Sequence, residues 1–158
     1  PILTVDNISA TVKRHVKREG LTLVIIDYLQ LIPAEDKRVN REQQVSAISR
    51  GLKKLALSLN IPVICLAQLN REAGNGEPQL NHLRESGALE QDADTVILIY
   101  QEKATDADNI LMMKIAKNRH GEPGQIAIFH NGQFTRFSEN ENIETVQPDD
   151  SEENTLPF

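Results

Sequence analysis

One stretch of the chain, residues 21–32 (LTLVIIDYLQLI), most constrains how the protein can fold. Residues 21–26 contain only leucine, threonine, valine and isoleucine, with no alternation between apolar and polar side chains. Such a run is typical of a strand that is covered on both faces, as in a parallel sheet packed between helices. The run ends on Asp27, so we expect a carboxylate at the carboxyl end of a buried strand.

The next segments repeat this pattern after a helix. Apolar residues recur at helical spacing over residues 41–59, which predicts a helix with one buried face and Lys53 on the opposite face. A second apolar run, residues 63–67, ends in Gln68. Strand, helix and strand at this spacing predict a βαβ unit with parallel strands. Asp27 and Gln68 should therefore emerge at the same edge of the sheet, where open α/β sheets bind ligands.

A strand-end aspartate has two interpretations. P-loop NTPases hold Mg²⁺ with an aspartate in this position. The alternative is an aspartate that caps a helix or a turn.

Two elements are expected before residue 21. Residues 2–5 are a candidate strand, and Asn7 or Ser9 can cap a helix that Gly20 ends.

The C-terminal half predicts an antiparallel end to the sheet. A short helix is expected over residues 88–91, and strands over 95–100 and 110–116. Residues 125–130 and 133–137 flank Asn131-Gly132, which is a strong signal for a two-residue hairpin turn. The sheet thus begins parallel and finishes with an antiparallel hairpin, in a fold of the α/β class.

The net charge of -6 is unevenly distributed. Seven of the 23 acidic residues follow Arg136, with no lysine or arginine among them. The first 138 residues are therefore nearly neutral, which argues against a protein that is basic all over. We expect one folded unit over residues 1–138 and an acidic, disordered tail over residues 139–158.

Composition also excludes several classes of protein. No run approaches the ~20 apolar residues of a membrane span, and we expect no secretory leader. The single cysteine, Cys65, lies in an apolar run and is interpreted as a small buried hydrophobe. The four histidines lack metal-ligand spacing, which argues against a zinc site. We therefore expect a cytoplasmic protein without membrane contact.

Six segments, taken in order, resemble the C-terminal half of a DnaB-type replicative helicase: IIDYLQLI, ISRGLKKLALSLNIPV, AQLNRE, LRESGALEQDAD, KNRHGEPG and HNGQFTRF. The resemblance covers about residues 2–137. It implies a RecA-like ATPase core, with a mostly parallel sheet flanked by helices. Asn118 and His120 stand in a turn that more often reads KQRNG in the family, and Phe134 replaces a common tryptophan. None of these departures removes a charged position.

The resemblance implies four residues at the nucleotide. Asp27 resembles the Walker B aspartate, which binds Mg²⁺ mostly through water, and Gln68 resembles the glutamine that senses the γ-phosphate. Lys117 and Arg119 resemble a basic pair that reaches the neighbouring subunit's ATP and stabilises charge on the transferred phosphoryl group. Because they are two residues apart on an extended segment, both can point the same way. The alternative is a solvated basic turn.

The resemblance also implies contacts to DNA. Arg84, Glu85 and Gly87 resemble a loop that lines a central channel and touches the backbone of single-stranded DNA. Residues 70–80 form a candidate second loop, with Arg71 as its basic residue. Aromatic stacking platforms are absent there, so the grip would be blind to sequence. The alternative is that Arg84 and Glu85 only cap or pair locally.

The implied whole protein is a homo-hexameric ring that uses ATP and Mg²⁺ to unwind DNA in the 5′ to 3′ direction, with primase and a helicase loader as partners. No GxxxxGK[ST] occurs in the chain, so we expect these 158 residues alone to hydrolyse no ATP. One alternative is a RadA/RecA-type recombination ATPase, which shares the strand-end aspartate and glutamine. Another is a non-catalytic assembly fragment that offers Lys117 and Arg119 in trans.

The tail ends DDSEENTLPF. An acidic run that closes on Pro-Phe is similar to the tip of bacterial single-stranded-DNA-binding proteins. By that resemblance, Leu156, Pro157 and Phe158 would bind a partner such as primase or a receptor for single-strand-binding tails. The alternative is a tail that only increases solubility.

Overall fold

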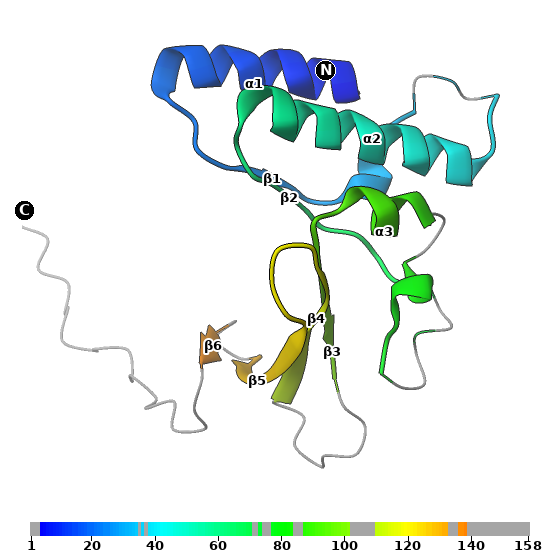
Figure 1. Ribbon diagram of the computed structural model, residues 1–158, viewed down its shortest axis with the longest axis vertical. Helices are drawn as coiled ribbons and strands as arrows, with labels where there is room; N and C mark the ends of the chain where they lie inside the picture. Colours follow the sequence, from blue (N-terminus) through cyan, green and yellow to red (C-terminus); the bar gives the residue numbers. More distant parts are fainter. Residues whose placement is uncertain are drawn as a thin grey trace, which may run out of the picture.

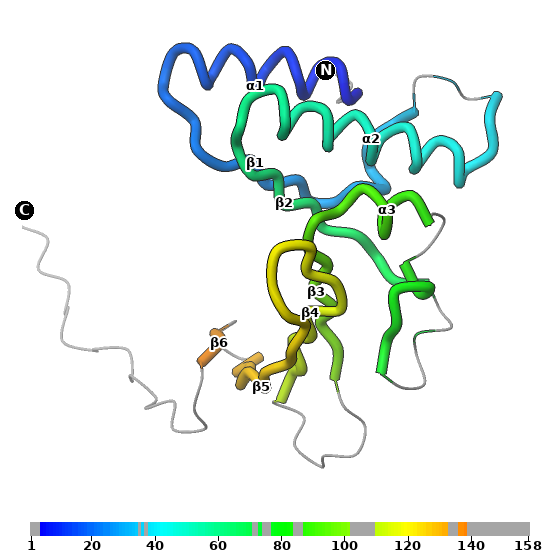
Figure 2. Tube along the Cα trace, viewed as in Figure 1, coloured from blue at the N-terminus to red at the C-terminus, as the bar shows by residue number. Residues whose placement is uncertain are grey.

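The computed structural model describes residues 4–34, 36, 38–70, 73, 77–83, 87–101, 110–132 and 136–138. Two long helices, α1 and α2, lie side by side over a pair of short parallel strands, and an antiparallel sheet extends away from them (Figure 1). The Cα trace gives the same arrangement (Figure 2). None of the described helices has the length and apolar character that crossing a membrane requires.

Helix α1 (Val5–Glu19) begins earlier than the sequence predicted. Its N-cap is Thr4, whose hydroxyl accepts a hydrogen bond from the backbone N–H of Asn7 at 3.3 Å. Asn7, one of the two predicted caps, thus lies inside the helix, and a strand over residues 2–5 is wrong at its last residue. Residues 2–3 lie outside the described part. Gly20 ends the helix with φ 72°, as predicted, because glycine adopts the left-handed conformation without strain.

Helix α2 (Arg41–Leu59) has the predicted bounds. Asn40 caps it by accepting a hydrogen bond from the backbone N–H of Gln43 at 2.8 Å. Its buried side chains form the core with two residues that follow the first strand, and the cluster consists of Leu29, Ile32, Val45, Ile48 and Leu52. Gly51 faces α1, where a Cβ would lie 2.6 Å from Val5 Cγ1. The glycine therefore allows the two helices to approach closely.

Strands β1 (Val24–Ile26) and β2 (Val63–Cys65) form a parallel pair, with Val24 opposite Val63 and Ile26 opposite Cys65. The predicted βαβ unit is thus confirmed. A one-turn 3-10 helix, η1 (Leu29–Leu31), follows β1 and brings Leu29 into the core beneath α2.

The parallel pair is covered on one face only within the described residues. Ile26 and Cys65 pack against the core on the side of α2. On the other side Ile25, Ile64 and Leu66 have exposed fractions of 63%, 49% and 47%. The expectation of a strand covered on both faces is therefore wrong for the described part of this chain, because none of its helices packs over that second face.

The second sheet is antiparallel and has the order β3-β4-β5-β6. Its strands are β3 (Thr95–Tyr100), β4 (Ile110–Asn118), β5 (Gly124–Asn131) and β6 (Arg136–Ser138). The antiparallel region is thus a four-stranded sheet, larger than the predicted hairpin. Asn131 pairs with Arg136, so the β5–β6 connection is longer than the predicted two-residue turn. In this register His130 is opposite Phe137, and the centroids of their rings lie 5.0 Å apart.

A short helix, α3 (Gly87–Asp92), leads into β3 and lies close to where the predicted helix was placed. It contacts α2, and Ser49 Oγ of α2 donates a hydrogen bond to Asp92 Oδ2 at 2.7 Å. A one-turn 3-10 helix, η3 (Leu80–His82), precedes it in the chain. The contact with α2 fixes the C-terminal end of α3 relative to the helical layer.

Candidate functional site

The carboxyl ends of β1 and β2 lie at one edge of the parallel pair. Because Ile26 is opposite Cys65 and the strands are parallel, the residues that follow them emerge on the same side. Asp27 follows β1 directly, and Gln68 lies just beyond β2. The shared edge predicted for these two residues is therefore confirmed. We refer to Asp27, Gln30 and Gln68 as the strand-end rim.

Hydrogen bonds join the two segments that follow the strands. The side chain of Gln30 donates to the carbonyl of Gln68 and accepts from the backbone N–H of Gln68, both at 3.4 Å. The backbone N–H of Leu29 donates to the carbonyl of Leu66 at 2.9 Å. Arg41 Nη2 in turn donates to the carbonyl of Gln30 at 3.1 Å. These bonds fix the backbone of Gln68 and leave its side-chain amide to be presented at an exposed position.

Sequence reasoning missed the bridging role of Gln30. Its place in the segment IDYLQL was the available signal, but the helical turn that aims it at the second strand is not readable from local pattern.

Asp27 is an exposed carboxylate at the end of β1, and its peptide bond to Tyr28 is cis. Within the described residues, no group of three or more His, Cys, Asp or Glu side chains could hold a metal ion. A lone carboxylate suits Mg²⁺, which keeps several waters and is commonly bound through one or two carboxylates and substrate phosphates. Asp27 thus fits a magnesium ion that arrives with a nucleotide.

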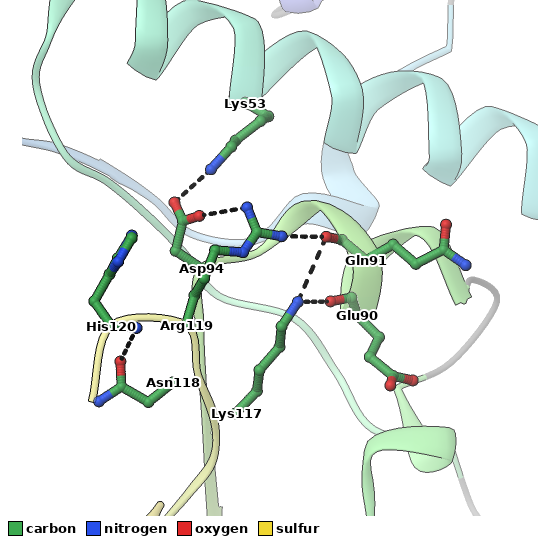
Figure 3. A network of polar contacts seen from close by, with 8 residues as sticks. All are labelled: Lys53, Glu90, Gln91, Asp94, Lys117, Asn118, Arg119 and His120. Atoms are coloured by element: carbon green, nitrogen blue, oxygen red, sulfur yellow. Dashed lines mark hydrogen bonds and ion pairs between the residues drawn. The ribbon is translucent and has the colours of Figure 1, made fainter. Parts of the chain in front are cut away.

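A second group of side chains, the basic cluster, consists of Lys53, Asp94, Lys117 and Arg119 (Figure 3). Asp94 directly precedes β3, and Arg119 directly follows β4. Because these strands are antiparallel, with Thr95 opposite Asn118, the start of β3 lies beside the end of β4. The backbone N–H of Arg119 accordingly donates to the carbonyl of Asp94 at 2.8 Å.

Both predicted cations reach the C-terminal end of α3. Arg119 donates from Nη1 to Asp94 Oδ1 at 3.1 Å and from Nη2 to the carbonyl of Gln91 at 3.2 Å. Lys117 Nζ donates to the carbonyl of Glu90 at 2.6 Å (Figure 3). The carbonyls at the end of a helix are suitable acceptors for cations, because they lack partners within the helix. The two cations therefore converge, as their spacing predicted.

Lys53 approaches Asp94 from α2 and forms an ion pair with Asp94 Oδ2. This hydrogen bond is the main reason why the pKa of the Asp94 carboxyl lies below its ordinary value, and the charges of Arg119 and His120 add to the effect. The sequence placed Lys53 on the outer face of α2, which is wrong because α3 packs against α2 and Asp94, which follows α3, reaches Lys53. One carboxylate thus stands between two cations.

Several predicted site residues lie outside the part of the chain that the structure describes. They are Arg71, Arg84, Glu85, Leu156, Pro157 and Phe158. Gly87 is the exposed first residue of α3. The channel-lining loops and the partner-binding tail therefore stay predictions.

The strand-end rim and the basic cluster are separate groups. The rim belongs to the parallel pair, while the cluster is built from α2, α3 and the antiparallel sheet. Across the described part of the chain, no hydrogen bond or ion pair joins a rim residue to a cluster residue. The chain thus presents a carboxylate and an amide at the end of the parallel strands, and two cations where α3 meets the antiparallel sheet.

Comparison with known proteins adds independent information. Residues 1–139 match the family described as DnaB-like helicase C terminal domain. The replicative DNA helicase DnaB of Leifsonia xyli subsp. xyli (strain CTCB07) is 41% identical over 146 residues, which cover 88% of this chain and 32% of that protein. The replicative DNA helicase DnaB of Rickettsia bellii (strain RML369-C) is 38% identical over an alignment of 176 residues. This alignment covers 94% of this chain and 35% of that protein. The chain spans about a third of the length of these curated relatives.

Two solved structures are also similar. One is described as an ATPase domain, with a TM-score of 0.80 and 36% identity over 87% of this chain and 52% of that chain. The other is described as a DnaB-like replicative helicase and its interactions with primase, with a TM-score of 0.78 and 36% identity over 85% of this chain and 35% of that chain.

Proposed function

The chain belongs to the DnaB-like helicase C-terminal domain family, and we propose that it forms the C-terminal part of the ATPase domain of a replicative DNA helicase. Its fold is the RecA-like α/β fold of its structural neighbours. The observation that carries the proposal is the parallel β1–β2 pair, which brings Asp27 and Gln68 to one edge in a chain with this family match.

At that edge, Asp27 would hold Mg²⁺ through water, and Gln68 would contact the γ-phosphate of ATP. The metal would bridge phosphate oxygens and offset the charge that develops there. A neutral amide can donate to a phosphate oxygen or accept from a water molecule, and neither contact requires a change of charge. The exposure of both side chains supports these roles, as does the backbone tie through Gln30.

Lys117 and Arg119 would act on the ATP of a neighbouring subunit in a homo-hexameric ring. An arginine supplied across such a boundary contributes ~10³ to 10⁵ in rate in other phosphoryl-transfer systems. The side chain of Arg119 is 46% exposed, so it can turn toward another subunit without unfolding its own.

The DNA contacts would come from Arg84, Glu85 and Gly87, with Arg71 in a second loop. Their place in the chain supports this role, since Gly87 opens α3 at an exposed position. The protein would then move 5′ to 3′ on single-stranded DNA and hold its backbone without reading sequence.

Partners follow from the same proposal. One similar structure concerns a helicase and its interactions with primase, which supports primase as a partner here. A helicase loader, and a receptor bound through Leu156, Pro157 and Phe158, belong to the same proposal. The family match ends at residue 139, which supports a folded unit over residues 1–138, with residues 139–158 as a tail. We place the protein in the cytoplasm, where DNA is replicated in bacteria such as its relatives.

The comparisons favour the helicase over a recombination ATPase, because the curated relatives described above are replicative helicases. We further propose that these 158 residues alone hydrolyse no ATP, since they contain no phosphate-cradling GxxxxGK[ST] motif.

Unwinding of a forked DNA duplex by the complete protein tests the function. Asp27→Ala should abolish both unwinding and ATP hydrolysis, because the metal loses its carboxylate. Asp36→Ala is a suitable control, since Asp36 is a loop carboxylate paired with Arg38 and has no proposed role. Full unwinding by the Asp27→Ala protein would contradict the proposal.

A further inference from the structure

Arg119 is held within its own chain by three hydrogen bonds. Its backbone N–H donates to the carbonyl of Asp94 at 2.8 Å. Its terminal nitrogens donate to Asp94 Oδ1 at 3.1 Å and to the carbonyl of Gln91 at 3.2 Å. Both terminal nitrogens of the guanidinium are therefore already engaged.

This arrangement competes with phosphate binding. Arginine binds phosphate most strongly when two N–H groups donate in parallel to two oxygens. The carboxylate of Asp94 takes one terminal nitrogen and offsets the positive charge of the group. The guanidinium keeps further N–H groups, but a carboxylate and a phosphate are both anions, so the bond to Asp94 opposes the binding of phosphate to Arg119.

Asp94 is itself anchored, so it does not follow the guanidinium. Lys53 holds its second carboxylate oxygen from α2, and the residue sits at the fixed start of β3 (Figure 3). Asp94 and Arg119 are each 46% exposed, and ion pairs as exposed as this one are weak and easily exchanged. The pair can thus hold Arg119 without trapping it.

We propose that Asp94 is a positioning residue for Arg119: it holds the guanidinium at the end of α3 while the neighbouring nucleotide site is empty, and yields it to the phosphates when ATP binds there. The inference rests on the proposed role of Arg119 across the subunit boundary. The phosphates compete with Asp94 for the same guanidinium, so the carboxylate weakens apparent ATP binding. Lys53 moderates this competition, because it shares the carboxylate with Arg119.

The two neighbours of Arg119 should shift the KM for ATP in opposite directions. Asp94→Asn keeps the shape of the side chain and removes the competing charge, so KM should fall about two- to fivefold with kcat unchanged. Lys53→Met leaves the carboxylate to Arg119 alone, so KM should rise about twofold. Asp94→Glu retains the charge and should restore the KM of the unmodified protein.

The test is steady-state ATP hydrolysis by the complete protein, with Asp36→Asn as the control. Asp36 forms an exposed ion pair with Arg38 of the same kind, and its substitution should leave KM unchanged. In an Arg119→Ala background, Asp94→Asn should have no further effect. If Asp94→Asn instead lowers kcat, leaves KM unchanged or lowers activity further in that background, the positioning role is wrong. If Arg119→Ala itself hydrolyses ATP normally, the proposed function of Arg119 is wrong instead.

Discussion

The strand-end rim and the basic cluster are held in different ways. Hydrogen bonds to the backbone of Gln68 position the rim: the side chain of Gln30 ties the segments after β1 and β2 together, and Asp27 and Gln68 are exposed. Side-chain ion pairs position the cluster, where Asp94 already engages Lys53 and Arg119. The rim is therefore open to a ligand as it stands, whereas the cluster must exchange an internal partner for an external one.

The sheets that support the rim and the cluster also differ in how unusual their exposed faces are. A parallel sheet is normally covered on both faces, yet Ile25 and Ile64 of the parallel pair are exposed. An antiparallel sheet can leave one face to water, so exposed Ile97 and Ile99 on β3 are less unusual. Within the described residues, the parallel pair thus lacks the second cover that such a sheet normally has, whereas an antiparallel sheet does not need one.

The largest expected effect tests the cluster. Arg119→Ala in the complete protein should lower kcat for ATP by ~10³ or more, because the charge of the transferred phosphoryl group loses its cation. Arg38→Ala, which removes an arginine from another exposed ion pair, should have no such effect.

The same substitution can show that the effect crosses the subunit boundary. Arg119→Ala subunits mixed with Asp27→Ala subunits should regain hydrolysis, since some interfaces then combine an intact rim with an intact arginine. Failure of the mixture to regain activity, in rings shown to contain both subunits, would contradict action in trans.

The next effect tests how well the parallel pair is covered. Burial raises the pKa of the Cys65 thiol to about 11, from an ordinary value of 9.0. At pH 8 the thiolate fraction, and with it the rate of alkylation by iodoacetamide, should be about 100-fold lower in the folded protein than in urea. Equal rates in the two states would mean that α2 does not cover β2.

A smaller effect compares the exposed faces of the two sheets. Ile64→Ser should lower the free energy of unfolding of the complete protein by ~2 kcal/mol, because we expect further polypeptide to cover that face. Ile97→Ser on β3 should have a smaller effect. Chemical denaturation of both variants measures the difference, and equal losses would remove the distinction between the sheets.

The smallest effect concerns acid stability. The folded pKa of Asp94 lies below its ordinary value, so its contribution to stability is complete above pH 3.8 and is lost as the pH falls through the lowered folded value. Because the group is half-exposed, Asp94→Asn should lower the unfolding free energy by no more than about 1 kcal/mol at pH 6 and by less near pH 2. Urea denaturation at both pH values measures this, and a loss that grows at low pH would show that the carboxylate does not stabilise the fold through its charge.

Local pattern predicted the elements that depend on local physics. The 3.6-residue period gave α2, and the strand–helix–strand spacing gave the shared edge of Asp27 and Gln68. Contacts between distant segments were missed. Lys53 falls on the polar side of an isolated helix, and only the approach of α3 makes it a partner of Asp94.

The β5–β6 register shows a similar limit. Asn131-Gly132 is a strong local signal for a tight turn, but the observed pairing of Asn131 with Arg136 lengthens the connection. The contact between His130 and Phe137 occurs only in that register, and such cross-strand pairing is not visible in the turn sequence alone.

Because α3 is short, its exposed first residue lies near the groups that bind Lys117 and Arg119. Six residues of helix measure about 9 Å, so the two ends of α3 lie close together. One tip is Gly87, and the carbonyls of Glu90 and Gln91 near the other tip are gripped by Lys117 and Arg119. The six residues therefore connect Gly87 directly to the acceptors of both cations, through a helix whose C-terminal end Ser49 holds against α2.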